Sequence, residues 1–130
     1  MNSNNYVPKS QLFDKLLSDT MSKIKSGSIM ILDENGLKIA EKHEGVTNND
    51  PIWGMANRLI HAGEKALREL SEQNMLNQTF ETDNYYLVLG SINKQMTYAI
   101  LNPKTAKQSL GLLRLHAQYL KKESKEILNV

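Results

Sequence analysis

The chain of 130 residues contains no cysteine, which excludes disulfide bonds, thiol catalysis and thiolate metal sites. It also lacks any apolar run near the roughly 18 residues that a membrane-spanning helix needs. Residues 1–8 are polar and show no apolar stretch typical of a secretory signal, so we expect a cytoplasmic protein. Because the chain has neither disulfide bonds nor thiolate metal sites, its stability should come from packing alone.

Charge of one sign is not in large excess either. Sixteen lysine and arginine residues stand against 14 aspartate and glutamate residues, which gives a net charge of +2. Dedicated nucleic-acid-binding proteins usually show a strong basic stripe, so we expect no nucleic-acid partner. Apolar residues make up 40% and charged residues 23%, as in ordinary globular domains. This length and composition predict a flexible tail over residues 1–8 and one domain over residues 9–130.

Catalytic motifs are missing as well. There is no G-x-x-x-x-G-K-[ST] loop, so the chain is not itself a P-loop GTPase. His43, His61 and His116 lie far apart and show no metal-binding spacing; we interpret the first two as solvated and the third as a partly buried packing residue. Asp33 and Glu34 are explained by a turn. We therefore expect no catalytic residue, no metal, no cofactor and no enzymatic activity.

The first third of the chain predicts a helix and a hairpin. Apolar residues recur at helical spacing over Ser10–Lys25, with Ser10 as the expected N-cap. Two short strands, Ile29–Leu32 and Leu37–Ala40, flank a turn that ends in Asn35-Gly36, a strong hairpin signal. The first strand is apolar at four consecutive positions, which indicates that it is covered on both faces.

A polar loop over residues 41–50 should lead into a second helix, with Asp50 as N-cap and Pro51 at its first position, continuing to about Glu72. The apolar residues of this helix form two adjoining stripes. Met55, Leu59, Ala62, Ala66 and Leu70 form one, and Trp53, Ala56, Ile60, Gly63 and Leu67 form the other. Together they cover about half of the circumference, more than one sheet contact needs, so the helix should bury two faces.

The remainder predicts three strands and a helix. The strands are expected over Gln78–Thr82, Tyr85–Ile92 and Gln95–Leu101, after which Asn102-Pro103 should end the sheet. Thr105 is the expected cap of a last helix that reaches about Leu128. This order of elements predicts a mixed α/β fold, a three-layer α/β/α sandwich around a five-stranded antiparallel sheet.

Three segments together resemble the Roadblock/dynein-light-chain family. Residues 29–40 are similar to its opening hairpin with a D-x-x-G turn. Residues 86–91 and 99–102 are similar to its central strands, and residues 109–115 to the start of its last helix, especially in bacterial polarity proteins. The resemblance extends over about Leu12 to Leu128. A longin domain, the nearest confusable fold, would open on a strand, whereas here a helix precedes the hairpin.

The resemblance implies a non-enzymatic protein that dimerises through its third strands and second helices. Family members bind small Ras-like GTPases or serve as docking platforms, including in dynein and lysosomal scaffolds, and a bacterial homodimer assists GTP hydrolysis on its partner. We therefore expect a homodimer, or a dimer with another Roadblock protein, and a Ras-like GTPase as partner. The expected dimer interface comprises Ala56, Ile60, Gly63, Leu67, Gln78, Thr79, Phe80, Glu81 and Thr82. The expected partner surface comprises Trp53, Asn57, Arg58, His61, Glu64, Lys65 and Arg68.

Several residues leave alternatives open. Trp53 suits either the core or an interface anchor, because tryptophan is enriched in binding hot spots. Gly63 costs about 1 kcal/mol relative to alanine in mid-helix, which the close approach of a neighbouring helix would offset. Arg58 and Arg68 are candidates for an arginine finger in trans.

A small-molecule sensor and an adaptor subunit of a larger motor or signalling platform are the alternative functions.

Basic residues gather towards the C-terminus. They are Lys104, Lys107, Arg114, Lys121, Lys122 and Lys125, against Glu123 and Glu126. A solvated helix face, with favourable charges near the helix C-terminus, explains them; contact with a membrane surface or with nucleic acid is the alternative.

Overall fold

The computed structural model describes residues 7–45, 50–70 and 75–129. Its helices are α1 (Lys9–Ile24), α2 (Asp50–Arg68) and α3 (Leu110–Leu128), and a short 3-10 helix, η2 (Lys104–Ala106), precedes α3. Its strands are β1 (Gly27–Asp33), β2 (Lys38–Glu44), β3 (Gln78–Glu81), β4 (Tyr85–Ser91) and β5 (Met96–Pro103). None of the described helices is long and apolar enough to cross a membrane.

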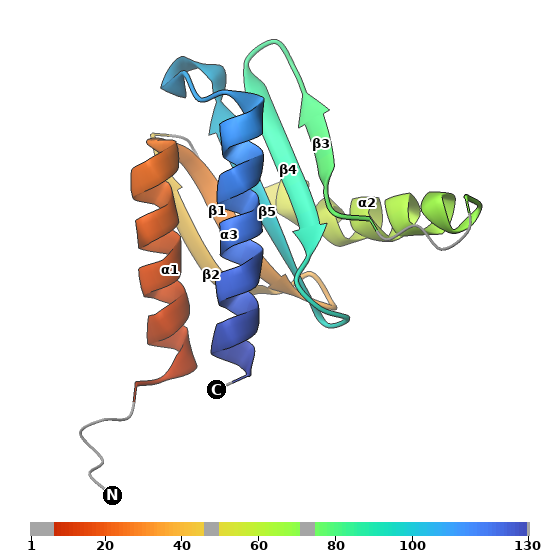
Figure 1. Cartoon of the computed structure of the whole chain (residues 1–130), viewed down its shortest axis with the longest axis horizontal. Coiled ribbons are helices and arrows are strands. Elements are labelled where there is room, and N and C mark those ends of the chain that lie inside the picture. Colours follow the sequence, from red (N-terminus) through yellow and green to blue (C-terminus); the bar gives the residue numbers. More distant parts are fainter. Residues whose placement is uncertain (1–6, 46–49, 71–74, 130) are drawn as a thin grey trace, which may run out of the picture.

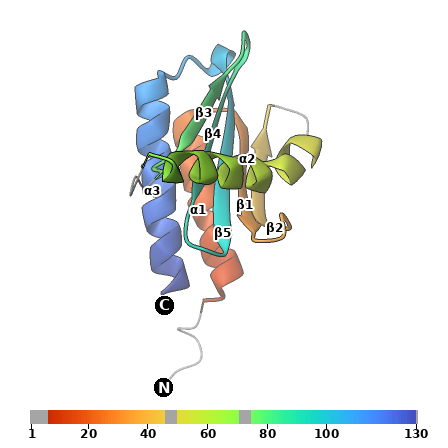
Figure 2. The same cartoon turned by 90° about the vertical axis from the view of Figure 1, so that its right-hand side faces the viewer.

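The strands form one antiparallel sheet in the order β2-β1-β5-β4-β3. Helices α1 and α3 lie side by side on one face of this sheet, and α2 lies on the other face (Figure 1). Seen from the side, α2 crosses the strands at a steep angle (Figure 2). The predicted three-layer sandwich with a five-stranded antiparallel sheet is confirmed.

The protein has two hydrophobic cores, one on each face of the sheet, and the side chains of β1 alternate between them. Ile29 and Ile31 pack beneath α1 and α3, whereas Met30 and Leu32 pack beneath α2. All four side chains are fully buried, as the uninterrupted apolar run predicted. The neighbouring strand β5 is buried along its whole length, so the centre of the sheet is shielded from water on both faces.

A tyrosine and a glycine fit together within the α1/α3 core. Tyr98 in β5 is the cross-strand neighbour of Gly90 in β4. A Cβ atom on Gly90 would lie 2.5 Å from the Tyr98 ring, so the glycine leaves room for that ring. Burial raises the pKa of Tyr98 to about 12, so its phenol stays neutral over the physiological pH range.

The predicted hairpin turn is also present. The Asp33 Oδ1 accepts hydrogen bonds from the backbone N–H groups of Asn35 and Leu37, both at 2.9 Å. Gly36 has a φ of +80°, which a side chain would disfavour. The carboxylate of Asp33 therefore closes the turn, as its position in the D-x-x-G sequence indicated.

Several predicted boundaries were wrong. Ser10 lies inside α1, because the helix begins at Lys9 and Pro8 occupies the cap position. Strand β1 begins at Gly27, whose φ of +128° and close approach to the Leu101 carbonyl exclude a side chain. Strand β2 runs to Glu44, through residues that the sequence assigned to a loop. Its polar residues fit there because β2 is an edge strand.

Three more corrections concern the ends of β5, β3 and α2. Strand β5 includes Asn102 and Pro103, which were expected to break the sheet; Pro103 closes it opposite Tyr85. Strand β3 ends at Glu81, one residue before the expected end. Helix α2 ends at Arg68, before the expected end near Glu72, which lies outside the described residues.

The cap of α3 is Ser109 and not Thr105, which lies in η2. The Ser109 Oγ accepts a hydrogen bond of 3.1 Å from the Leu112 N–H. We predict that Ser109→Ala lowers the free energy of unfolding by about 1 kcal/mol, since it leaves an end donor unsatisfied. Urea denaturation would measure this loss. Thr105→Ala is the matched control, for which we expect an unchanged free energy of unfolding. Equal losses in the two variants would contradict the assignment.

Candidate functional site

Helix α2 has one buried stripe, and this stripe belongs to the protomer's own core. Trp53, Ala56 and Ile60 have at most 1% of their surface exposed, and they pack against Met30, Leu32 and the facing residues of β4 and β5. The expectation that Ala56 and Ile60 contact a second subunit is therefore corrected. Trp53 is likewise a core residue and not part of a partner surface. The helical spacing of apolar residues predicted the stripe, but it did not predict that the protomer's own sheet covers it.

Asn57 is corrected for a similar reason. Only 8% of it is exposed, and its Nδ2 donates a hydrogen bond of 2.8 Å to the Asp33 carbonyl. Its Oδ1 accepts one of 2.9 Å from the Thr97 hydroxyl. The amide thus fixes α2 to the β1–β2 turn and to β5, and it is not available to a partner.

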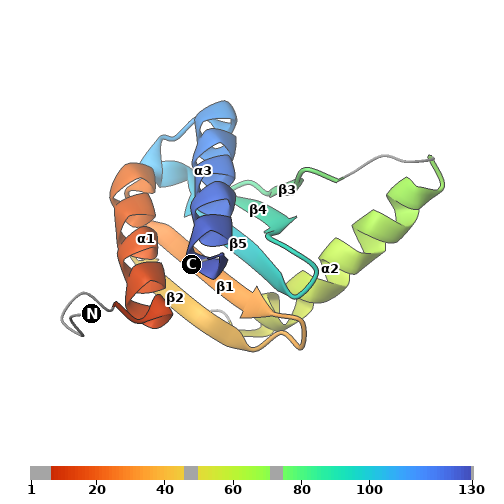
Figure 3. The same cartoon turned by 60° about the horizontal axis from the view of Figure 1, so that its bottom comes forward.

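The C-terminal half of α2 extends past the β3 side of the sheet, as Figure 3 shows. Along this half an apolar groove of about 490 Å³ separates α2 from β3. Its lining comprises Leu59, Ala62, Gly63, Ala66, Leu67, Met75, Asn77, Gln78 and Phe80. Ala62 and Ala66 are exposed, as is 40% of Phe80. An overhanging apolar helix beside an open groove is a surface that a partner would cover.

Gly63 has an explanation within the chain. A Cβ atom at this position would lie 1.7 Å from the Gln78 Nε2 and 3.1 Å from the Met75 sulfur. The same Gln78 Nε2 donates a hydrogen bond of 2.7 Å to the Leu59 carbonyl. The glycine therefore admits Gln78 of its own chain, which corrects the expectation that a neighbouring helix requires it.

Strand β3 is the edge strand on this side, and no other strand in the described part of the chain pairs with its outer edge. At its end, Lys104 Nζ lies 2.6 Å from Glu81 Oε2, and this hydrogen bond raises the pKa of Lys104. Near its start, Thr79 Oγ1 accepts a hydrogen bond from Arg114 Nε at 3.4 Å. Thr82, expected in the strand, instead belongs to the turn, where its hydroxyl accepts from the Tyr85 N–H.

The charged side of α2 carries the remaining residues of the expected partner surface. Arg58, Lys65 and Arg68 are exposed and form no ion pair among the described residues. His61 Nδ1 lies 3.7 Å from Glu64 Oε1. Binding of a partner to this charged side stays a prediction.

A polar pocket of about 390 Å³ continues this charged side toward the tips of two hairpins. His61, Glu64 and the buried Asn57 line it from α2. The other lining residues are Glu34, Ser91, Asn93, Lys94, Gln95 and Thr97. Sequence reasoning missed these residues, because turn chemistry accounted for them locally: the Asn93 Oδ1, for example, accepts from the backbone N–H groups of residues 95 and 96.

The three histidines lie on three different elements, β2, α2 and α3. His43 lies in β2 and is half-buried, which corrects its placement in a loop. Its Nδ1 is 2.7 Å from the Ser28 Oγ and its Nε2 is 2.8 Å from Glu41. Ser28 is fully buried, so no substrate reaches this serine, and the contacts tie β2 to β1. His116 is half-buried, and burial together with Lys23 lowers its pKa.

No group of three or more histidine, aspartate or glutamate side chains is placed to hold a metal ion in the described ranges. The arrangement around α2 and β3 offers two features instead. One is an apolar groove beside an unpaired strand edge, and the other is a charged helix face beside a polar pocket. Of the two, the exposed apolar groove is the feature that marks candidate binding surfaces.

No protein-family model matches the sequence, and no curated protein matches it. Solved structures do match. Myxococcus xanthus MglB is 15% identical; the match covers 95% of this chain and 92% of that one, with a TM-score of 0.82. A structure described as MglB with tetrameric arrangement is 14% identical and covers 94% and 91%, with a TM-score of 0.82.

The Roadblock/LC7 domain from Streptomyces avermitilis is 18% identical, covers 90% of this chain and 98% of that chain, and gives a TM-score of 0.76. Identities this low establish the fold alone. The chain therefore has the Roadblock fold, and the fold that its sequence resemblance implied is confirmed.

Proposed function

We propose that this chain is a self-associating, non-enzymatic regulator or scaffold for a small Ras-like GTPase. The observation that carries the proposal is the overhanging half of α2, which places an apolar groove next to the unpaired edge of β3 on a Roadblock fold. Roadblock proteins, as the sequence resemblance implies, dimerise through these two elements and bind GTPases. One of the matched MglB structures is described as tetrameric, which supports self-association as a property of this fold.

In the proposed homodimer, two β3 strands pair by their outer edges and continue the sheet. The overhanging half of each α2 then covers the groove of the other copy, which removes Ala62, Ala66 and Phe80 from water. A two-fold arrangement satisfies both requirements at once, because each copy supplies one helix and one groove. The interface residues that remain from our prediction are Gly63, Leu67 and residues 78–81; Leu59, Ala62 and Ala66 are added to them.

The GTPase would bind the charged side of the paired helices, formed by Arg58, His61, Glu64, Lys65 and Arg68. Stimulated hydrolysis would then come from ordering the GTPase's own switch segments, since GTP hydrolysis requires a positioned water and stabilised charge. Arg58 and Arg68 are both exposed on this side, which supports keeping both as candidates for an arginine finger.

The test is a pull-down with the immobilised protein against the Ras-like GTPases of its own organism, each loaded with GDP or a non-hydrolysable GTP analogue. We expect at least one GTPase to bind with a preference for one nucleotide state, because the switch segments differ between the states. Single-turnover hydrolysis with and without the protein separates an activator from a scaffold. If no GTPase binds in either state, the proposal fails, and the small-molecule sensor and the adaptor without a GTPase become the functions to test.

A further inference from the structure

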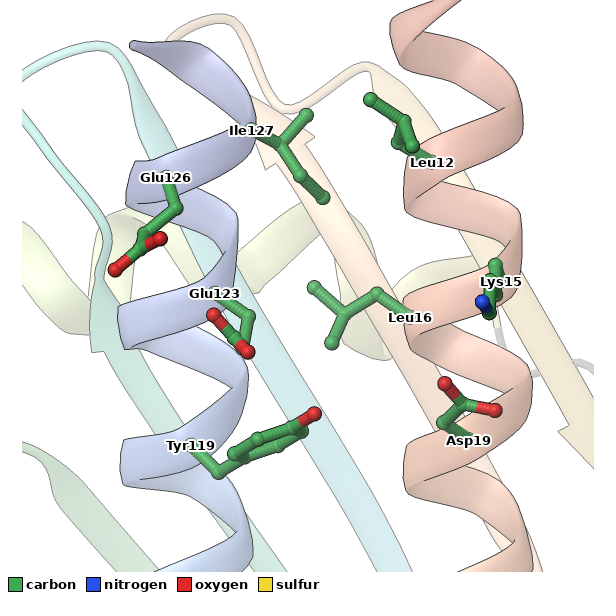
Figure 4. A pocket seen from close by; sticks show the side chains of 8 residues that line it. All are labelled: Leu12, Lys15, Leu16, Asp19, Tyr119, Glu123, Glu126 and Ile127. Carbon is green, nitrogen blue, oxygen red and sulfur yellow. The ribbon is translucent and has the colours of Figure 1, made fainter. Parts of the chain in front are cut away.

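A second groove lies on the opposite face of the molecule, between α1 and α3. Its volume is about 360 Å³, and the apolar side chains of Leu12, Leu16, Tyr119 and Ile127 form its floor (Figure 4). Leu16 is buried, Leu12 and Ile127 are half-buried, and 36% of Tyr119 is exposed. The groove is thus open to solvent along an apolar floor, although α1 and α3 already pack against each other beneath it.

The rim of this groove is acidic. Asp19 stands on the α1 side and Glu123 on the α3 side. Glu126 and Lys15 also line the groove, and Figure 4 shows the Glu126 carboxylate turned away from α1. Among the described residues, none of these three carboxylates takes part in an ion pair or a side-chain hydrogen bond. With three carboxylates against one lysine, the side chains that line the groove carry a net charge of −2.

Two cations at the ends of the groove are engaged elsewhere. Lys23 Nζ lies 3.9 Å from the centroid of the Tyr119 ring, a cation–π contact that holds the ring at one end of the floor. Lys9 Nζ donates a hydrogen bond of 3.3 Å to the Leu128 carbonyl at the other end. Neither lysine forms an ion pair with the rim carboxylates. Lys121, Lys122 and Lys125 share a separate pocket with Glu126 and do not line this groove.

We propose that the α1/α3 groove binds a cationic amphipathic helix of a partner protein. An amphipathic helix lays apolar side chains spaced one turn apart into a groove of this shape. Lysine or arginine residues flanking those side chains would pair with Asp19, Glu123 and Glu126, which fixes the register and favours this partner over acidic competitors. The small volume accommodates a few aliphatic side chains, so we expect a dissociation constant on the order of ten micromolar.

This groove lies across the sheet from α2, so its occupation does not compete with the proposed GTPase surface. The inference goes beyond the proposed function, because it adds a second partner that the protein can hold at the same time. A protein with two such faces would connect a GTPase to another component.

The test uses two synthetic helical peptides of about four turns with leucines at identical positions. One carries lysine and arginine at the flanking positions and the other carries glutamate. In titrations followed by fluorescence anisotropy, we expect the cationic peptide to bind at least tenfold more tightly, and less tightly as salt is added. Backbone amide shifts of the full chain should change around Leu12–Asp19 and Tyr119–Ile127.

The variant for this test is Glu123→Gln with Glu126→Gln, which keeps the shape of the rim and removes two charges. This variant should bind the cationic peptide at least fivefold more weakly than the parent does. Its thermal stability and its GTPase binding should stay unchanged. The matched control is Glu69→Gln with Asp83→Asn, which removes two exposed carboxylates away from the groove.

Four results would overturn the inference: no binding, equal binding of both peptides, amide shifts away from the groove, or equal binding to the groove variant and the control. Because GTPase binding is measured separately, failure of this inference leaves the proposed function intact, and failure of the GTPase pull-down leaves the groove testable.

Discussion

The double change Ala62→Glu and Ala66→Glu is expected to convert the proposed dimer into a monomer. Both positions are exposed in the C-terminal half of α2, so the protomer itself has room for the longer side chains. In the dimer they would face the apolar groove of the second copy. Burial of a carboxylate without a partner costs several kcal/mol, so the two changes should raise the dimer dissociation constant at least 100-fold.

Light scattering across a concentration series would measure this effect. The matched control is Gln11→Glu with Ser18→Glu, which adds the same charge at exposed positions of α1. The control should remain dimeric, and both variants should unfold cooperatively at temperatures near that of the parent. A parent that is monomeric at high concentration, or a double α2 variant that dimerises as well as the parent, would show that α2 does not form the interface.

The fold was predictable because burial on two faces leaves a clear pattern. Strands such as Ile29–Leu32 are apolar at every position, and only a sheet covered on both faces explains that. Capping was less predictable, because Ser109 and Thr105 are both good cap residues and only the position of η2 decides between them. The end of β2 was missed because an edge strand does not need apolar residues.

The candidate site was predicted only in outline. The apolar arc of α2 indicated two buried faces, yet periodicity alone does not tell the face that meets the protomer's own sheet from the face that remains open. Ile60 and Ala62 illustrate this: the first is fully buried and the second is exposed. Asn57 looked like a surface polar residue because its partners, Asp33 and Thr97, are 24 and 40 residues away in the sequence.

The α1/α3 groove had no sequence signature of its own. Leu12 and Leu16 belong to the apolar stripe of one helix and Ile127 to that of another, so each helix by itself reads as an ordinary amphipathic element. The groove arises only when the two helices lie side by side and bring Asp19 and Glu123 to one rim. The charge of such a rim depends on tertiary packing, which a single sequence does not encode in a local pattern.

The double change Arg58→Glu and Lys65→Glu is expected to abolish GTPase binding while the dimer persists. Both side chains are exposed on the charged side of α2 and have no ion-pair partner among the described residues, so the folded protomer does not depend on them. Exposed substitutions of this kind shift stability by less than about 0.5 kcal/mol, so a loss of binding would not reflect unfolding. Complementary charge across an interface governs association rate and specificity, and the change reverses two charges on each subunit.

Pull-down and titration against the GTPase identified with the parent protein would measure the effect, and we expect binding to weaken at least 100-fold. Lys42→Glu with Lys122→Glu is the matched control, because it reverses two exposed charges outside α2. If the control loses binding equally, net charge and not the α2 surface governs recognition. If the α2 variant binds as tightly as the parent, the GTPase docks elsewhere, and the polar pocket between α2 and the hairpin tips, with Glu34 and Lys94 at its rim, becomes the next surface to test.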